Sequence, residues 1–159
     1  MPHRPLLRLH ACVNEFFGVP GVLNCGFSDQ TESTTGLNRH THDGYELTYI
    51  SRGEVVWVLD GEPRELRLLG GCAALTQPGV PHHGKWNAIT PSRLFWLIFD
   101  PRQFHRPGSR FTALSRTGAA AADAAFRQAG NRVWNAAPPL RQAFEECRGA
   151  LERLNRPAP

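Results

Sequence analysis

The stretch "HTHDGYELTYISRG", residues 40–53, decides how this chain folds, together with "PGVPHHG", residues 78–84. His40 and His42 are two residues apart, so on an extended strand both imidazoles leave the same face, and Glu46 and Thr48 keep that parity. His82 follows a proline-glycine turn that can bring a third imidazole to the same place. Imidazoles and a carboxylate together suit a divalent transition metal such as Zn, Ni, Fe or Mn.

The segments around these residues have the composition of short strands. The runs 45–51 and 54–60 flank Arg52-Gly53 and predict a hairpin. That hairpin would set Thr48 opposite Trp57 and turn Trp57 into the interior. Asp60-Gly61 predicts a type I′ turn into a further strand over 63–69. Segment 72–77 continues the series, and the nearly continuous apolar run 93–100 should be a central strand. Such spacing predicts an antiparallel barrel or sandwich.

Two motifs in these strands resemble those of a known family. The spacing His40-x-His42, Glu46 and Gly53 resembles the first cupin motif, and Gly79-x-x-His82 resembles the core of the second. The longer runs "LTQPGVPHHG" and "RLFWLIFDP" resemble the N-terminal sensing domain of AraC-type transcriptional regulators. The resemblance implies a mainly β fold, a cupin or jelly-roll antiparallel β-barrel followed by two C-terminal α-helices.

The C-terminal part has helical character. The alanine-rich segment 119–134 predicts a helix with Thr117 as its N-cap, ended by Pro138-Pro139. The last segment places apolar residues four and three apart in an a/d seam, namely Leu140, Phe144, Cys147, Leu151 and Leu154. A dimer interface and a helix packed on its own barrel would show the same seam, and the AraC-type resemblance favours the dimer. We therefore expect a cupin-like barrel with an N-terminal arm over 1–110, and a helical dimerisation segment ending in a linker over 111–159.

Composition limits the classes of function. The 159 residues carry a net charge of +4, with Lys85 as the single lysine and the arginines scattered, so this segment alone should not read DNA. No apolar run approaches the ~20 residues of a membrane span, and residues 1–18 lack the h-region and cleavage site of a signal peptide, so we expect a cytoplasmic protein. The four cysteines form no C-x-x-C pair, and we expect reduced thiols.

We interpret the chain as the ligand-sensing and dimerisation domain of an AraC-type regulator, without its DNA-binding half. A small effector, with sugars as first candidates, would enter the barrel and contact His40, His42, Glu46, Thr48, Trp57, His82 and Trp86. Any metal would be held by His40, His42, Glu46 and His82. The alternative is a stand-alone metal-dependent cupin enzyme, a dioxygenase or an isomerase. No catalytic residue is assigned, since the sequence has no nucleophile elbow, P-loop or dinucleotide fingerprint. Residues 1–36 predict either an arm over the barrel mouth or an edge strand with a loop.

Overall fold

The computed structural model describes residues 8–13, 19–105 and 114–154, of which 8–13 and 154 are described by their backbone alone. The expected linker after residue 154 and part of the expected N-terminal arm lie outside these residues. The elements in chain order are β1 (Arg8–Val13), β2 (Val22–Gln30), β3 (Thr34–Thr35), β4 (Tyr45–Leu59), β5 (Leu66–Leu69), β6 (Cys72–Thr76), β7 (His82–Gly84), the 3-10 turn η1 (Lys85–Asn87), β8 (Ala88–Ile89), β9 (Ser92–Phe99), the 3-10 turn η2 (Pro101–Gln103), α2 (Arg116–Ala129), β10 (Arg132–Asn135) and α3 (Pro138–Leu154).

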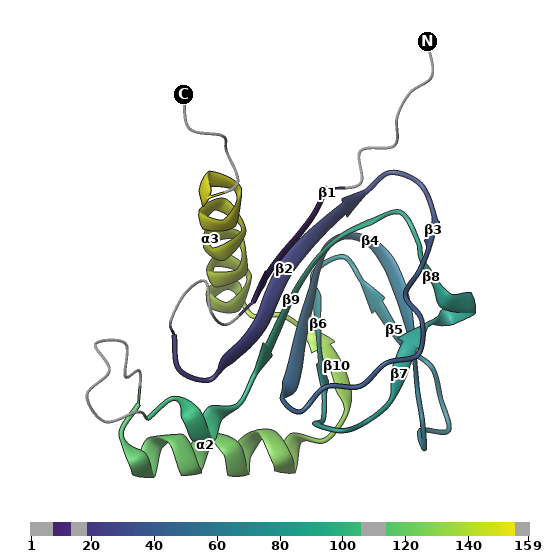
Figure 1. The fold of residues 1–159 in the computed structure, drawn as a ribbon. Helices are drawn as coiled ribbons and strands as arrows, with labels where there is room; N and C mark the ends of the chain where they lie inside the picture. The colour runs from purple at the N-terminus through teal and green to yellow at the C-terminus, as the bar shows by residue number, and fades with distance from the viewer. Residues whose placement is uncertain (1–7, 14–18, 106–113, 155–159) are drawn as a thin grey trace.

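The strands form an antiparallel barrel of the jelly-roll, cupin type, which confirms the predicted fold class. The larger sheet has the order β1-β2-β9-β4-β6-β10, while β5 and β7 both pair with the second half of β4. Strands β3 and β8 pair with each other beside the barrel. In Figure 1, α3 stands against the β2 side of the large sheet and α2 crosses the lower end of the barrel. No helix in the described part of the chain is long and apolar enough to cross a membrane.

Strand β4 joins the two sheets, and the predicted hairpin at Arg52-Gly53 is wrong. The chain continues through this dipeptide as one strand, pairing with β9 and β6 before it and with β5 and β7 after it. Gly53 has a φ of +84°, and a β-carbon there would overlap the carbonyl oxygen of Pro91. The glycine therefore permits a close backbone approach and a bend, and it does not reverse the chain.

The next turn, at Asp60-Gly61, does reverse the chain and produces the β4–β5 hairpin. Gly61 has a φ of +80°, whereas Asp60 is not among the described residues with positive φ. The turn therefore is not the predicted type I′, which needs positive φ at both central residues. Its single left-handed position at Gly61, with a hydrogen bond from Glu62 N to Leu59 O, has the pattern of a type II turn.

Strand β9 is central, as its apolar run predicts, because it lies between β2 and β4. Both of its faces are covered. Leu94 packs in the cluster between the two sheets, while Phe95 packs under α3 and Phe99 packs against residues of α2. A strand buried on both faces has no polar side to alternate with, which explains the continuous apolar sequence.

The predicted helix over 119–134 is partly wrong. Helix α2 begins after Ser115, whose Oγ accepts a hydrogen bond from Gly118 N at 3.1 Å, so Ser115 and not Thr117 is the N-cap. The helix ends before Gly130, which has a φ of +64°. Strand β10 follows and pairs with β6, because β-forming Val133 and Trp134 find a free sheet edge there. This strand carries residues of the expected helical segment into the barrel sheet.

Helix α3 packs its apolar seam on the chain's own sheet. Phe144 and Leu151 are buried in one cluster with Tyr49 and Phe95, and Leu140 packs partly buried against it. Of the remaining seam positions, Cys147 is exposed, and the side chain of Leu154 lies outside the described residues. Phe144 and Leu151 are therefore not free to form the predicted dimer seam, because the outer face of the sheet already covers them.

Candidate functional site

A cavity of about 300 Å³ lies inside the barrel, between the large sheet and the strands that close it. Residues of β2, β4 and β9 form its walls, and β3, β8 and the segment 36–40 close one side. Its lining residues are Ser28, Gln30, Thr34, Thr35, Gly36, Leu37, His40, Glu46, Trp57, Ile89, Leu94, Trp96 and Ile98. The cavity thus has a mixed lining, in which polar side chains such as Ser28, Gln30 and Glu46 stand beside apolar and aromatic ones.

At one end of this cavity, Glu46 is the centre of a buried polar cluster. Its Oε2 lies 2.9 Å from His82 Nε2 and 3.0 Å from His42 Nε2. Its Oε1 accepts a hydrogen bond from Thr48 Oγ1 at 3.1 Å. Glu46 and Thr48 lie on the same face of β4, as their spacing predicts.

His40 joins this cluster through the backbone. The segment around it forms an isolated antiparallel bridge with β7, in which His40 N donates to His82 O at 3.0 Å and His82 N donates to His40 O at 2.9 Å. The ring centroids of His40 and His82 are 4.3 Å apart, whereas those of His40 and His42 are 6.3 Å apart. Tertiary pairing therefore brings His40 closer to the distant His82 than to its neighbour in sequence.

The hydrogen bonds of the imidazoles determine which nitrogen faces the cluster. The Nδ1 atoms lie close to main-chain carbonyl oxygens, His40 to Asn38 at 2.8 Å, His42 to Gly44 at 2.7 Å and His82 to Val80 at 2.9 Å. Because a carbonyl oxygen only accepts, Nδ1 carries a hydrogen in each ring. Nε2 is then left to face Glu46 or to ligate a metal, which is the orientation found in histidine metal ligands.

A metal would find three ligand atoms together. His40, Glu46 and His82 each offer one donor atom within 4.8 Å of the other two, and they form the one such group among the described residues. His42 stands outside this group and contacts it through Glu46. The structure thus brings together three of the four predicted metal ligands and places the fourth as their neighbour.

Charge is concentrated in the Glu46–His82 pair. Burial acts to raise the pKa of Glu46, but hydrogen bonds from His42 and His82 and their charge outweigh it and hold that pKa far below its usual value. Burial likewise acts to lower the pKa of His82, yet the hydrogen bond and charge of Glu46 outweigh it, so the pKa of His82 is raised. Each group therefore stabilises the charged form of the other.

The remaining predicted residues divide between the cavity and the surface. Trp57 lines the cavity and is buried, although the hairpin from which this position was predicted does not exist. Its Nε1 has no hydrogen-bond partner among the described residues. Trp86 does not line the cavity. It lies on η1 with a φ of 56° and is 80% exposed, because the turn directs it away from the barrel.

Sequence reasoning missed the opposite wall, formed by β2 and β3. Gln30 Nε2 donates to Ser28 Oγ at 3.0 Å, and Thr34 Oγ1 donates to Gln30 Oε1 at 2.6 Å. Trp96 also faces the cavity, and its Nε1 donates to Asn24 Oδ1 at 2.7 Å. Ser28 and Gln30 are two residues apart and share one face of β2, but Asp29 between them and Thr31 after them are also polar, so the sequence has no polar–apolar alternation that could have identified this wall.

Comparisons with known proteins identify one family and several similar structures. The family described as AraC-like ligand binding domain matches residues 26–159. Oxalate decarboxylase from Bacillus subtilis superposes with a TM-score of 0.43 and 14% identity, over 62% of this chain and 26% of that one. The EutQ protein of Clostridium difficile superposes with a TM-score of 0.42 and 14% identity, over 62% of this chain and 65% of that one. The chain thus spans about a quarter of the length of the decarboxylase. No curated protein sequence matches it.

Proposed function

Because the chain belongs to the family of AraC-like ligand binding domains, we propose that it is the effector-sensing and dimerisation domain of an AraC-type transcriptional regulator, acting in the cytoplasm. DNA would be contacted through a separate domain that this sequence does not include. The observation that carries the proposal is the cavity of about 300 Å³, which is lined by buried polar groups as well as apolar ones and lies within the residues that the family matches. Pockets of about this size and mixed polarity are typical small-molecule sites.

The lining suggests the chemistry of the effector. His40, Glu46 and Gln30 can donate to or accept from hydroxyl and amide groups, while Trp57 and Trp96 provide flat faces. A sugar or sugar-derived compound is the first candidate, because it presents both hydroxyls and an apolar face. The unpaired Nε1 of Trp57 is a donor that an effector oxygen could meet after a small side-chain shift.

Isothermal titration calorimetry against a panel of sugars and sugar acids tests this proposal. Trp57→Leu should abolish the heat of binding, whereas Trp86→Leu should leave the dissociation constant unchanged, because Trp86 is 80% exposed and lies outside the cavity. If a sugar binds and Trp86→Leu weakens it while Trp57→Leu does not, the effector site is not in this cavity. No heat from the whole panel would reject sugars as the effector class.

We propose further that His40, Glu46 and His82 hold a divalent transition metal, with His42 supporting Glu46. The donor set suits Zn, Ni, Fe or Mn, and the Nδ1–carbonyl contacts leave Nε2 of each ring as the ligating atom. The metal would supply a Lewis acid in the wall of the cavity, where His40 and Glu46 line it. His82→Ala should remove bound metal in elemental analysis, and His83→Ala is the matched control, since its Nδ1 contacts the Gly84 carbonyl at 2.8 Å and it lies outside the group.

The same three residues favour a second function, a metal-dependent cupin enzyme. A metal in this position could activate oxygen or polarise a carbonyl group, as in dioxygenases and isomerases. Oxygen consumption by the Fe-loaded chain with small organic substrates would support this alternative. Binding of an effector without turnover would support the sensor.

The homodimer through the C-terminal helices remains a proposal. With Phe144 and Leu151 packed on the chain's own sheet, a partner would meet α3 along its other faces, which carry the ion pairs of Arg148 with Glu145 and Glu152. Sedimentation velocity at rising protein concentration should show a dimer. A monomer at every concentration would reject it.

A further inference from the structure

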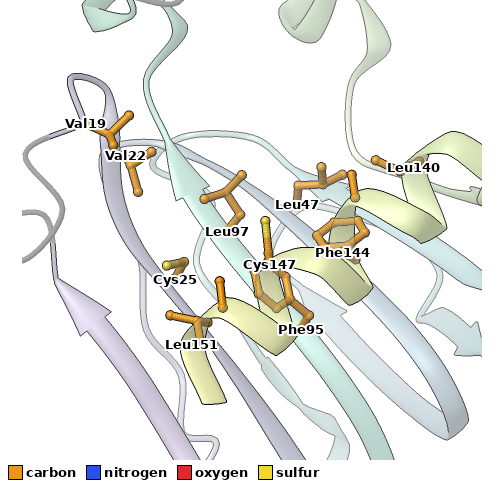
Figure 2. A pocket seen from close by; sticks show the side chains of 12 residues that line it. Val19, Val22, Cys25, Leu47, Phe95, Leu97, Leu140, Phe144, Cys147 and Leu151 are labelled. Carbon is orange, nitrogen blue, oxygen red and sulfur yellow. The ribbon is translucent and has the colours of Figure 1, made fainter. Parts of the chain in front are cut away.

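A second cavity lies on the other side of the sheet, under α3. Its volume is about 340 Å³, and it shares no lining residue with the barrel cavity. Strand β9 separates the two, since Phe95 and Leu97 face the second cavity while the alternate residues Leu94 and Trp96 face the first. Figure 2 shows the residues of α3 and of the sheet facing each other across this space.

The size of the side chains on α3 creates the cavity. Phe144 and Leu151 are buried anchors two helical turns apart, and Phe144 stacks on Tyr49 with ring centroids 5.1 Å apart. Between the anchors, the cavity is lined on the helix side by Cys147 and Ala150, which have small side chains. The anchors therefore set the distance between helix and sheet, and the small residues leave the space between them open. The space opens to solvent on one side, where Ala143 and Cys147, two of its lining residues, are exposed.

The walls define the chemistry of what this space can hold. Every lining side chain is apolar or a cysteine, and none is charged or carries a hydroxyl or amide group. Such a space disfavours water, ions and sugars, because they would lose hydrogen bonds on entering. An uncharged apolar molecule would lose none. The volume lies at the small end of the range of ligand pockets, about 300–1,000 Å³.

We propose that this cavity is a second ligand site that binds a small uncharged apolar molecule, such as an aromatic or short-chain hydrocarbon compound. Its occupant would contact the sheet at Leu47 and Phe95 and the helix at Cys147, so it would fasten α3 to the sheet. A second copy of the chain is a poorer occupant, because the large apolar residues Phe144 and Leu151 already point inward. Occupancy of this site and of the barrel cavity can differ, since they have opposite polarity and lie on opposite faces of β9.

The neutral fluorescent probe N-phenyl-1-naphthylamine tests the site on the full 159-residue chain. The probe should bind at one equivalent, and Ala150→Phe should fill the space and weaken binding by about ten-fold or more. Thr35→Phe, which narrows the barrel cavity instead, should leave the affinity unchanged. If Thr35→Phe removes binding and Ala150→Phe does not, the probe site is in the barrel and the proposal is wrong.

Alkylation of Cys147 gives a second measurement that needs no variant. Cys147 is exposed and lines the cavity, so saturating probe should slow its reaction with N-ethylmaleimide severalfold, while Cys72, which does not line the cavity, reacts at its usual rate. Unchanged labelling of Cys147 would overturn the proposal. Labelling that slows with protein concentration and not with probe would identify a second copy of the chain as the occupant, and would overturn it equally.

Discussion

Phe144→Ala should destabilise the folded chain itself, because the seam of α3 packs within one molecule. Phe144 is buried, stacks on Tyr49 at 5.1 Å with an interplanar angle of 8°, and meets Phe95 edge to face at 4.9 Å. Truncating a core phenylalanine to alanine costs about 3–5 kcal/mol. The neighbouring cavity lets α3 settle and partly close the new space, so we expect the lower end, about 3 kcal/mol, which corresponds to a fall in Tm of roughly 6–12 °C.

Urea unfolding followed by circular dichroism measures this loss, at two protein concentrations tenfold apart. Cys147→Ala is the control on the same helix: its side chain is exposed, and its free energy of unfolding should change by less than about 0.5 kcal/mol. Two results together would refute the reasoning. Phe144→Ala would lower the free energy of unfolding by less than about 1 kcal/mol, and the unfolding midpoint would depend on protein concentration only in the unsubstituted chain. They would mean that Phe144 belongs to a dimer interface.

Three further predictions test the barrel and its site. Gly53→Ala should lower the free energy of unfolding several times more than Gly61→Ala in the same urea assay. Both glycines have positive φ, but only at Gly53 would a β-carbon overlap a neighbouring backbone. Equal losses would contradict this account of the β4 bend. In chelator-treated protein, Glu46→Gln should cost most stability between about pH 4.5 and 6.5. The stabilisation from the lowered pKa of Glu46 is lost as the pH falls well below 4.5. The stabilisation from the raised pKa of His82 is lost as the pH rises above the pKa of His82 in the folded chain. A stability difference between Glu46→Gln and the unsubstituted chain that does not change with pH would contradict the ion pair. Ser115→Ala should cost about 1 kcal/mol through loss of the α2 N-cap, and an unchanged Tm would place the cap elsewhere.

Local pattern was enough to predict several elements. The unbroken apolar run of β9 predicts a strand with two covered faces, and the parity of Glu46 and Thr48 predicts a shared face of β4. The Pro78-Gly79 turn before His82 correctly predicts a loop that returns to the histidines, where the structure forms the His40–His82 bridge. These features depend on backbone periodicity and turn chemistry, which a short stretch of sequence contains in full.

Other features depended on neighbours far away in the sequence. A glycine such as Gly53 can form a turn that reverses the chain, or it can lie where another backbone passes close by. Here the backbone of Pro91, which is distant in the sequence, lies against Gly53, so the fold uses the glycine for close approach. Helix α2 ends at Gly130, and residues 132–135 form a strand because they pair with the edge of β6.

Sequence alone determined that this chain is an antiparallel barrel and singled out the histidines and the glutamate of its candidate site, because strand periodicity and turn residues act locally. The predicted strand face shared by His40, His42 and Glu46 is wrong, since β4 begins only at Tyr45. Tertiary structure decided which of those residues converge, leaving His42 beside the His40–Glu46–His82 group and Trp86 outside the cavity. It also decided that the α3 seam faces its own sheet, since an apolar stripe specifies that it must be covered but not by what.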